Sequence, residues 1–249
     1  MTGMGRNAAD AGPASEPTRV SVGTLPLFGL LLALTLLTLG GCAPSGPVEE
    51  ARPLDAGQLA MQAERSSALD SPYRIVFEWS VVEPGMRVQG RGVARVEPPY
   101  RARLDLFSRG GERITAAALV DGELRIPEGL PELLPQPTMF WGSLGVFRPD
   151  RGMGLAGGRW QRDGLAELRY RPGADSELLV LLNRNRVQEM VRRSNGRALE
   201  DLRLEMVEGE RFPRQATYRD HVRTRELRMR LETVEHVESY PSDIWEPRR

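Results

Sequence analysis

Residues 73–97 read YRIVFEWSVVEPGMRVQGRGVARVE, and the fold class can be inferred from their pattern. In its first part every second residue is apolar and mostly large: Tyr73, Ile75, Phe77, Trp79 and Val81. An alternation of period two is typical of a β-strand with one buried face. Glu83-Pro84-Gly85 marks a turn, and a second strand is expected from Met86 to Glu97. The stretch therefore predicts an antiparallel hairpin with one apolar face and one charged face.

Two glycines, Gly90 and Gly92, fall on the apolar face of the second expected strand. A glycine inside a strand indicates a sharp bend or a close approach of another backbone. We therefore expect either a sharp bend of the sheet or a close backbone approach at these two glycines.

The same period recurs along the rest of the chain. Asp121-Gly122, Asp163-Gly164 and Asn195-Gly196 are typical two-residue hairpin turns. Helical patterns do not alternate with the strands, which argues against a parallel α/β fold. The pattern predicts about ten to eleven short strands joined by tight turns. The further strands are expected at 100–106, 113–120, 123–126, 159–161, 165–171, 178–182, 187–193, 202–206, 213–218 and 227–234.

Two helical segments are expected. Asp55 followed by Gln58 is a capping-box-like start for a helix over 56–69. The strand alternation lapses over 127–158, where four prolines precede a short helix that Thr138 can cap. The predicted fold class is mainly β (α+β): a strongly curved antiparallel half-barrel whose concave face is covered by the helices. Residues 56–249 are expected to form this single domain, with a helical insertion near 127–158.

The N-terminal region carries a targeting pattern. Residues 24–39, TLPLFGLLLALTLLTL, are apolar and uncharged but short for a membrane-spanning helix. Leu39-Gly40-Gly41-Cys42 follows and resembles the lipobox of bacterial lipoproteins. This resemblance implies a signal peptide over 1–41, an acylated Cys42 and a flexible tether over 42–55. The alternative is a short membrane helix with an incidental cysteine. Ala43, rather than aspartate, follows the cysteine, which by resemblance to lipoproteins favours the periplasmic face of the outer membrane over the inner membrane.

Composition excludes several function classes. The 34 basic residues balance 34 acidic ones, whereas a nucleic-acid-binding protein needs surplus positive charge. All the basic residues are arginine, so a lysine nucleophile is excluded. One cysteine and two histidines do not make a convincing metal site. We expect no cofactor, no bound metal and no enzymatic activity.

Over residues 56–247 the chain resembles the LolA/LolB-like family of outer-membrane lipoprotein carriers and receptors. The resemblance rests on the first helix, on Tyr73–Val81, on the strand that contains Gly90-Arg-Gly92-Val-Ala-Arg, and on the segment Pro98-Pro-Tyr-Arg-Ala-Arg-Leu-Asp-Leu106. It continues with the Asp121-Gly122 hairpin, Phe212-Pro213 and the Ile244-Trp245-Glu246-Pro247 tail. It implies that acyl chains bind inside a half-barrel closed by helices. In the receptor a protruding loop carries an exposed leucine, whereas the corresponding turn here, 108–112, has none.

The apolar faces of the expected strands supply candidate cavity residues. They either line a cavity for acyl chains or fill an ordinary core. The cavity candidates are Ile75, Phe77, Trp79, Val88, Leu104, Leu106, Leu168, Tyr170, Leu204, Met229 and Leu231. The insertion is either a mobile lid over that cavity or a fixed plug. The lid candidates are Met139, Phe140, Trp141 and Leu144.

Three functions are compatible with these patterns. The first is a membrane-anchored lipoprotein that holds acyl chains or lipoproteins in a hydrophobic cavity, in lipid or lipoprotein localisation. The second is a structural or assembly lipoprotein that uses the same fold to dock an envelope protein complex. The third, an envelope hydrolase, would require converging carboxylates with a raised pKa in a polar cleft. No nucleic-acid partner is expected.

Overall fold

A computed structural model describes residues 54–127 and 133–247. The predicted signal peptide, Cys42 and most of the predicted tether lie outside the described residues. Among the described residues, no helix is both long and apolar enough to cross a membrane.

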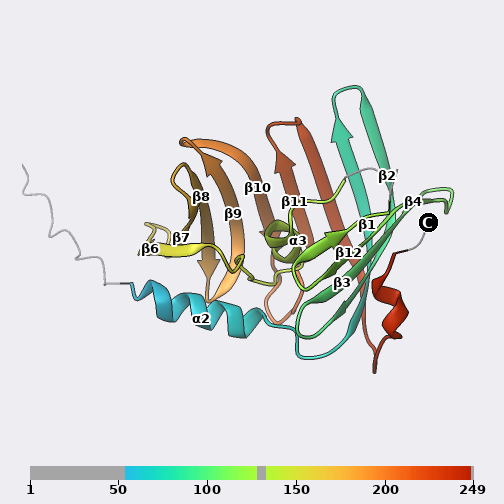
Figure 1. Ribbon diagram of the computed structural model, residues 1–249, viewed down its shortest axis with the longest axis horizontal. Helices are drawn as coiled ribbons and strands as arrows, with labels where there is room; N and C mark the ends of the chain where they lie inside the picture. The colour runs from blue at the N-terminus through green and yellow to red at the C-terminus, as the bar shows by residue number, and fades with distance from the viewer. Residues whose placement is uncertain (1–53, 128–132, 248–249) are drawn as a thin grey trace, which may run out of the picture. The chain divides into compact units, whose positions relative to one another are not determined.

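The described residues form one antiparallel sheet in the order β5-β4-β3-β2-β1-β12-β11-β10-β9-β8-β7-β6 (Figure 1). The predicted mainly β fold is confirmed. The strands are β1 (Tyr73–Glu83), β2 (Met86–Glu97), β3 (Arg101–Ser108), β4 (Arg113–Val120), β5 (Glu123–Arg125), β6 (Gly154–Trp160), β7 (Ala166–Gly173), β8 (Ser176–Asn183), β9 (Arg186–Ser194), β10 (Arg197–Glu205), β11 (Gln215–Asp220) and β12 (Arg225–His236).

The strand order consists of two meanders joined at the centre. The first strand, β1, pairs with the last, β12, with Phe77 opposite Leu231 and Trp79 opposite Met229. The strands β5 and β6 are consecutive in the chain but stand at opposite edges of the sheet. The connection between them must therefore pass from one edge to the other, and it contains the helix α3 (Pro137–Ser143). In Figure 1 the sheet curves around α3.

The count of twelve strands corrects the expected total of ten to eleven, although the ranges expected from the sequence, the first hairpin included, already number twelve and each overlaps one observed strand. The two edge strands, β5 and β6, have the least distinct strand pattern in the sequence. β5 has only three residues, and β6 begins at Gly154 rather than 159. The first five residues of β6, GLAGG, show no alternation because glycine and alanine carry little or no side chain.

The helix α2 (Ala56–Ser67) begins as expected and ends two residues earlier than the predicted 69. The backbone N–H of Gln58 donates to Asp55 Oδ1 at 2.9 Å, which caps the helix. Its buried residues, Ala60 and Ala63, pack in one cluster with Leu168 and other inward side chains of β7–β11. Small side chains let the helix lie close to the sheet.

Of the two alternatives expected at Gly90 and Gly92, the close approach is present. A Cβ at Gly90 would lie 1.8 Å from the carbonyl oxygen of Phe107, and one at Gly92 would lie 2.2 Å from Phe77 Cζ. Real Cβ atoms cannot occupy either position unless a neighbour moves. β2 therefore approaches β3 and the Phe77 ring more closely than a side chain permits.

The C-terminal segment packs on the opposite face of the sheet. The 3₁₀ helix η2 (Ser242–Trp245) buries Trp245 against Ala118 and Val120 of β4. The guanidinium of Arg103 donates to the Ile244 carbonyl at 2.8 Å. Trp245 is therefore structural.

Candidate functional site

The eleven cavity candidates lie on inward positions of the sheet, and they divide into two clusters. Ile75, Phe77, Trp79, Leu104 and Leu106 are buried together over β1 and β3, with Val88 and Leu231 packed beside them. Leu168, Tyr170 and Leu204 belong to the other cluster, beneath α2. Met229 on β12 contacts both clusters. One continuous apolar face therefore spans the two halves of the sheet.

The four lid candidates are all buried. Met139 packs in the cluster of Leu168 and Tyr170, whereas Phe140, Trp141 and Leu144 pack in the cluster of Phe77 and Leu104. α3 therefore fills the boundary between the two clusters.

The backbone of α3 lies directly on β9 and β10. A Cβ at Gly142 would lie 2.5 Å from Met190 Sδ and 2.8 Å from Leu202 Cδ2. The short helix thus occupies the position where an apolar ligand would touch the sheet. In this conformation its side chains complete the core.

Little space remains under α3. A cavity of about 20 Å³ lies between Leu104 and Leu144, and one of about 10 Å³ lies between Leu144 and Ile75. A cavity needs roughly 10–15 Å³ to hold one water molecule. No acyl chain fits between α3 and the sheet while the helix stays in place.

Several polar atoms under and around α3 are buried with no hydrogen-bond partner. They are Thr138 Oγ1, Trp141 Nε1 and the Tyr170 hydroxyl. Burial raises the pKa of Tyr170 above its ordinary value, and the Glu64 carboxylate adds to that shift. An unsatisfied buried polar group costs about 1–3 kcal/mol, so this closed arrangement is not fully stabilised.

A wider opening, which we call the vestibule, lies beside the N-terminal end of α3. Its volume is about 620 Å³, within the range of roughly 300–1,000 Å³ that small-molecule sites occupy. Leu134 and Pro135 line both the vestibule and the 20 Å³ cavity, so the two spaces adjoin. The vestibule is lined by Leu124, Ile126, Leu134, Pro135, Gln136, Pro137, Arg192, Glu200, Tyr218, Asp220, Val222 and Arg223.

The polar wall of the vestibule is a hydrogen-bonded group. Arg192 Nε donates to Glu200 Oε2 at 2.8 Å, and this bond raises the pKa of Arg192. Burial raises the pKa of Tyr218, and neighbouring Glu200 adds to the shift. Asp220 accepts from the backbone N–H groups of Val222 and Arg223 at 2.9 Å each. The vestibule thus has one polar and one apolar wall, which suits an amphiphile.

The polar wall was not among the sites expected from the sequence, although the sequence contains a pattern that marks it. Arg192, Glu200 and Asp220 each lie two residues from an inward apolar residue, namely Met190, Leu202 and Tyr218. Because side chains two residues apart in a strand point to the same face, these three charged side chains lie on the inward face, near the strand ends. Charged residues in an apolar register are the feature that could have located the vestibule.

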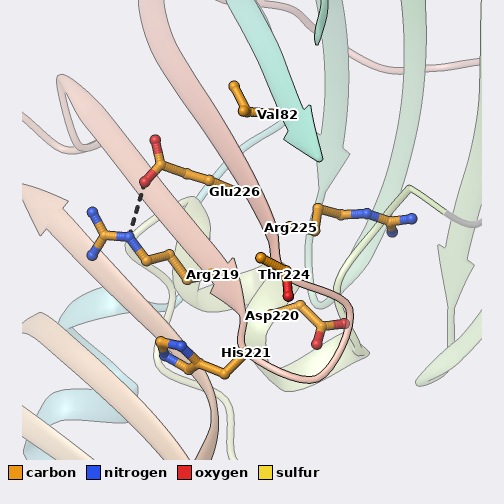
Figure 2. Close-up of a pocket in the computed structure, with 7 residues that line it drawn as sticks. All are labelled: Val82, Arg219, Asp220, His221, Thr224, Arg225 and Glu226. Atoms are coloured by element: carbon orange, nitrogen blue, oxygen red, sulfur yellow. Dashed lines mark hydrogen bonds and ion pairs between the residues drawn. The ribbon is translucent and has the colours of Figure 1, made fainter. Parts of the chain in front are cut away.

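A separate pocket of about 320 Å³ lies at the turn between β11 and β12 (Figure 2). Arg219 Nε donates to Glu226 Oε2 at 2.9 Å, which the dashed line in Figure 2 marks. His221 Nε2 lies 2.6 Å from Asp201 Oδ2, and Arg225 pairs with Glu83. The charges of this pocket pair with one another, as on an ordinary salt-bridged turn.

The His, Asp and Glu side chains of residues 54–127 and 133–247 do not gather into a metal site. In these ranges no group of three or more His, Cys, Asp or Glu side chains could hold a metal ion. Burial raises the pKa of the Glu64 carboxyl on α2, but no second carboxylate contributes to that shift. The converging carboxylates that a hydrolase site would require are not found at Glu64.

The sequence matches no protein-family model and no curated protein. Its fold is similar to solved structures. A LolA superfamily protein from Nitrosomonas europaea has a TM-score of 0.52 and 13% identity, over 78% of this chain and 98% of that chain. An outer membrane lipoprotein-sorting protein domain from Vibrio parahaemolyticus has a TM-score of 0.44 and 8% identity, over 76% of this chain and 95% of that chain. The described residues have a LolA-like fold.

Proposed function

We propose that this protein is a lipoprotein, anchored through Cys42 to the periplasmic face of the outer membrane, that binds acyl chains or lipoproteins on its concave face. This proposal rests mainly on the apolar face of the sheet, which spans both clusters and is covered by α3. The LolA-like fold supports the lipid-binding class. No covalent chemistry is part of this proposal.

The mechanism follows from the position of α3. An acyl chain would displace Phe140, Trp141 and Leu144 and take their place against Phe77 and Leu104. Each CH₂ removed from water contributes about 0.8 kcal/mol, which offsets the contacts that α3 gives up. Displacement also exposes Trp141 Nε1 and Thr138 Oγ1 to water, which removes their unsatisfied burial. The polar end of the ligand would remain in the vestibule.

A photoreactive fatty acid tests this site. Cells that express the full chain take up a diazirine-bearing fatty acid, are irradiated, and the purified protein is mapped by mass spectrometry. We expect labels on peptides that contain β1, β3 or α3. The variant Leu104→Phe fills the 20 Å³ cavity and should reduce labelling several-fold. The matched variant Met86→Phe, at an exposed position, should retain it. Absent labelling, or equal loss in both variants, would contradict the proposal.

The anchor has a separate test, because Cys42 is the only cysteine. Cells fed an alkynyl palmitate should label the wild-type chain, and the Cys42→Ser variant should lose all label. The wild-type chain should also fractionate with the outer membrane. A variant that loses its label but still resists extraction from the membrane would support the alternative, a membrane helix at residues 24–39.

A second function, an assembly lipoprotein that docks an envelope complex, is favoured by one observation. The cavities of about 20 and 10 Å³ show that the concave face is filled in the described conformation. If no fatty acid labels the chain in cells, the fold serves as a scaffold and its outer surfaces become the candidate docking sites.

A further inference from the structure

The edge strand β6 presents large apolar side chains to solvent. Trp160 is 45% exposed and Leu155 is 36% exposed. They lie opposite Ala166 and Tyr170 of β7, so both are on the inward side of the sheet, at its margin. β6 is the last strand at one edge of the sheet, so within the described residues no strand pairs with its outer side. Native proteins cover or disrupt such edges, and this one combines an open edge with exposed apolar groups.

The first described residues, Leu54 and those that follow it, lie against β6. Leu54 packs against Gly158, because a Cβ there would lie 2.8 Å from Leu54 Cδ2 and 3.2 Å from Ala56 Cβ. Gly158 lies between Leu155 and Trp160 along β6. Figure 1 shows the start of α2 beside β6 at the same end of the sheet. Leu54, from which the chain runs back towards Cys42, therefore packs on β6 between Leu155 and Trp160.

The length of that segment limits how far β6 can be from an anchor at Cys42. Eleven residues separate Cys42 from Leu54. At about 3.3–3.6 Å per residue, the chain reaches at most about 40 Å when fully extended. An acylated Cys42 would thus keep Leu54, and the β6 residues beside it, within about 40 Å of the bilayer.

The charges around β6 balance. Arg159 pairs with Glu167 at 2.9 Å, and Arg162 adjoins Asp163 in the turn that follows. The surface therefore has no strong attraction for an anionic or a cationic partner. Tryptophan prefers the headgroup level of a bilayer, where its ring is buried and its N–H stays hydrated. This chemistry fits a lipid bilayer surface.

We propose that β6, through Trp160 and Leu155, lies on the bilayer to which Cys42 anchors the chain. This inference rests on the proposed anchor. Contact through β6 turns the sheet margin toward the lipid, rather than leaving the domain free on its tether. Because the contact is apolar, it does not weaken when the salt concentration rises.

Tryptophan fluorescence can test the contact directly. The chain has four tryptophans, and Trp79, Trp141 and Trp245 are buried. Quenching by lipids with brominated acyl chains therefore reports chiefly on Trp160. The full-length lipoprotein is purified from membranes and reconstituted into phosphatidylethanolamine–phosphatidylglycerol vesicles with and without brominated lipid. We expect strong quenching and a blue shift in the wild-type protein, and loss of the lipid-dependent part in Trp160→Phe.

A matched variant tests whether the contact is specific to β6. Met86 is 42% exposed on β2, far from β6 in the strand order. In Trp160→Phe, the further change Met86→Trp supplies an exposed indole that should not be quenched by brominated lipid. If the indole introduced on β2 is quenched as strongly as Trp160 is in the wild-type protein, the inference is overturned, because the domain then contacts the bilayer without a preferred face.

The outcomes separate this inference from the anchor. If the wild-type protein floats with the vesicles but Trp160 is not quenched, the anchor holds and the β6 contact is wrong. If Trp160 is protected from aqueous iodide in a concentration-dependent way without lipid quenching, β6 pairs with a second copy instead. If the protein carries no lipid and does not float, the anchor is wrong and the β6 contact, which rests on it, is overturned with it; Cys42→Ser then behaves as wild type.

Discussion

Replacing Trp141 by alanine is expected to lower the free energy of unfolding by about 3–5 kcal/mol, the range for removal of a buried tryptophan. The same change is expected to raise uptake of an acyl-chain probe several-fold. Trp141 is the largest fully buried side chain among the described residues, and its ring contacts Phe140 and Tyr100. Its loss weakens α3 and leaves apolar space under it.

The conservative variant Trp141→Phe separates the two effects. Phenylalanine keeps most of the apolar contact and removes Nε1, which is buried without a partner. We therefore expect a stability close to that of wild type and an uptake no greater than wild type. Thermal unfolding and binding of a fluorescent fatty acid to the full chain measure both quantities. If Trp141→Ala destabilises the protein without raising uptake, α3 is a fixed plug and not a lid.

Local pairing in this fold is predictable from the sequence, whereas the long-range arrangement is not. The hairpins at Asp121-Gly122 and Asn195-Gly196 were expected, and both pairs adopt positive φ angles. The turn at Arg184-Asn185 also has positive φ at both residues, but Arg-Asn is not a typical turn pair. The pairing of β1 with β12 joins residues more than 140 positions apart, and no local pattern encodes it.

The sequence does not distinguish a mobile lid from a fixed plug for the insertion at 127–158, because the role of this segment depends on the strand order of the sheet. Only the strand order shows that β5 and β6 occupy opposite edges and that the connection between them crosses the apolar face. The side chains Phe140 and Trp141 are apolar under either reading. Their burial by the sheet explains how the face is closed, and only a ligand experiment can show whether it opens.

The close approach of the Phe107 backbone to Gly90 is the second place where a single substitution should have a large effect. In Gly90→Ala the new Cβ would lie 1.8 Å from the Phe107 carbonyl oxygen and 2.9 Å from its carbon. These are backbone atoms, so the clash cannot be relieved by a rotamer change. The same oxygen accepts a hydrogen bond from Trp79 Nε1 at 3.2 Å, which the shift would strain.

We expect Gly90→Ala to lower the free energy of unfolding by at least about 3 kcal/mol, above the usual range for overpacking because the contact is with backbone. Gly92→Ala should cost less, because its Cβ meets the end of the Phe77 ring, which can move. Gly173→Ala is the matched control, since no atom lies within 4 Å of its Cβ position. Denaturant unfolding of the three variants should give this order. If Gly90→Ala unfolds like Gly173→Ala, β2 can move away from β3 at no cost. The close approach at Gly90 would then not fix the curvature that forms the apolar face.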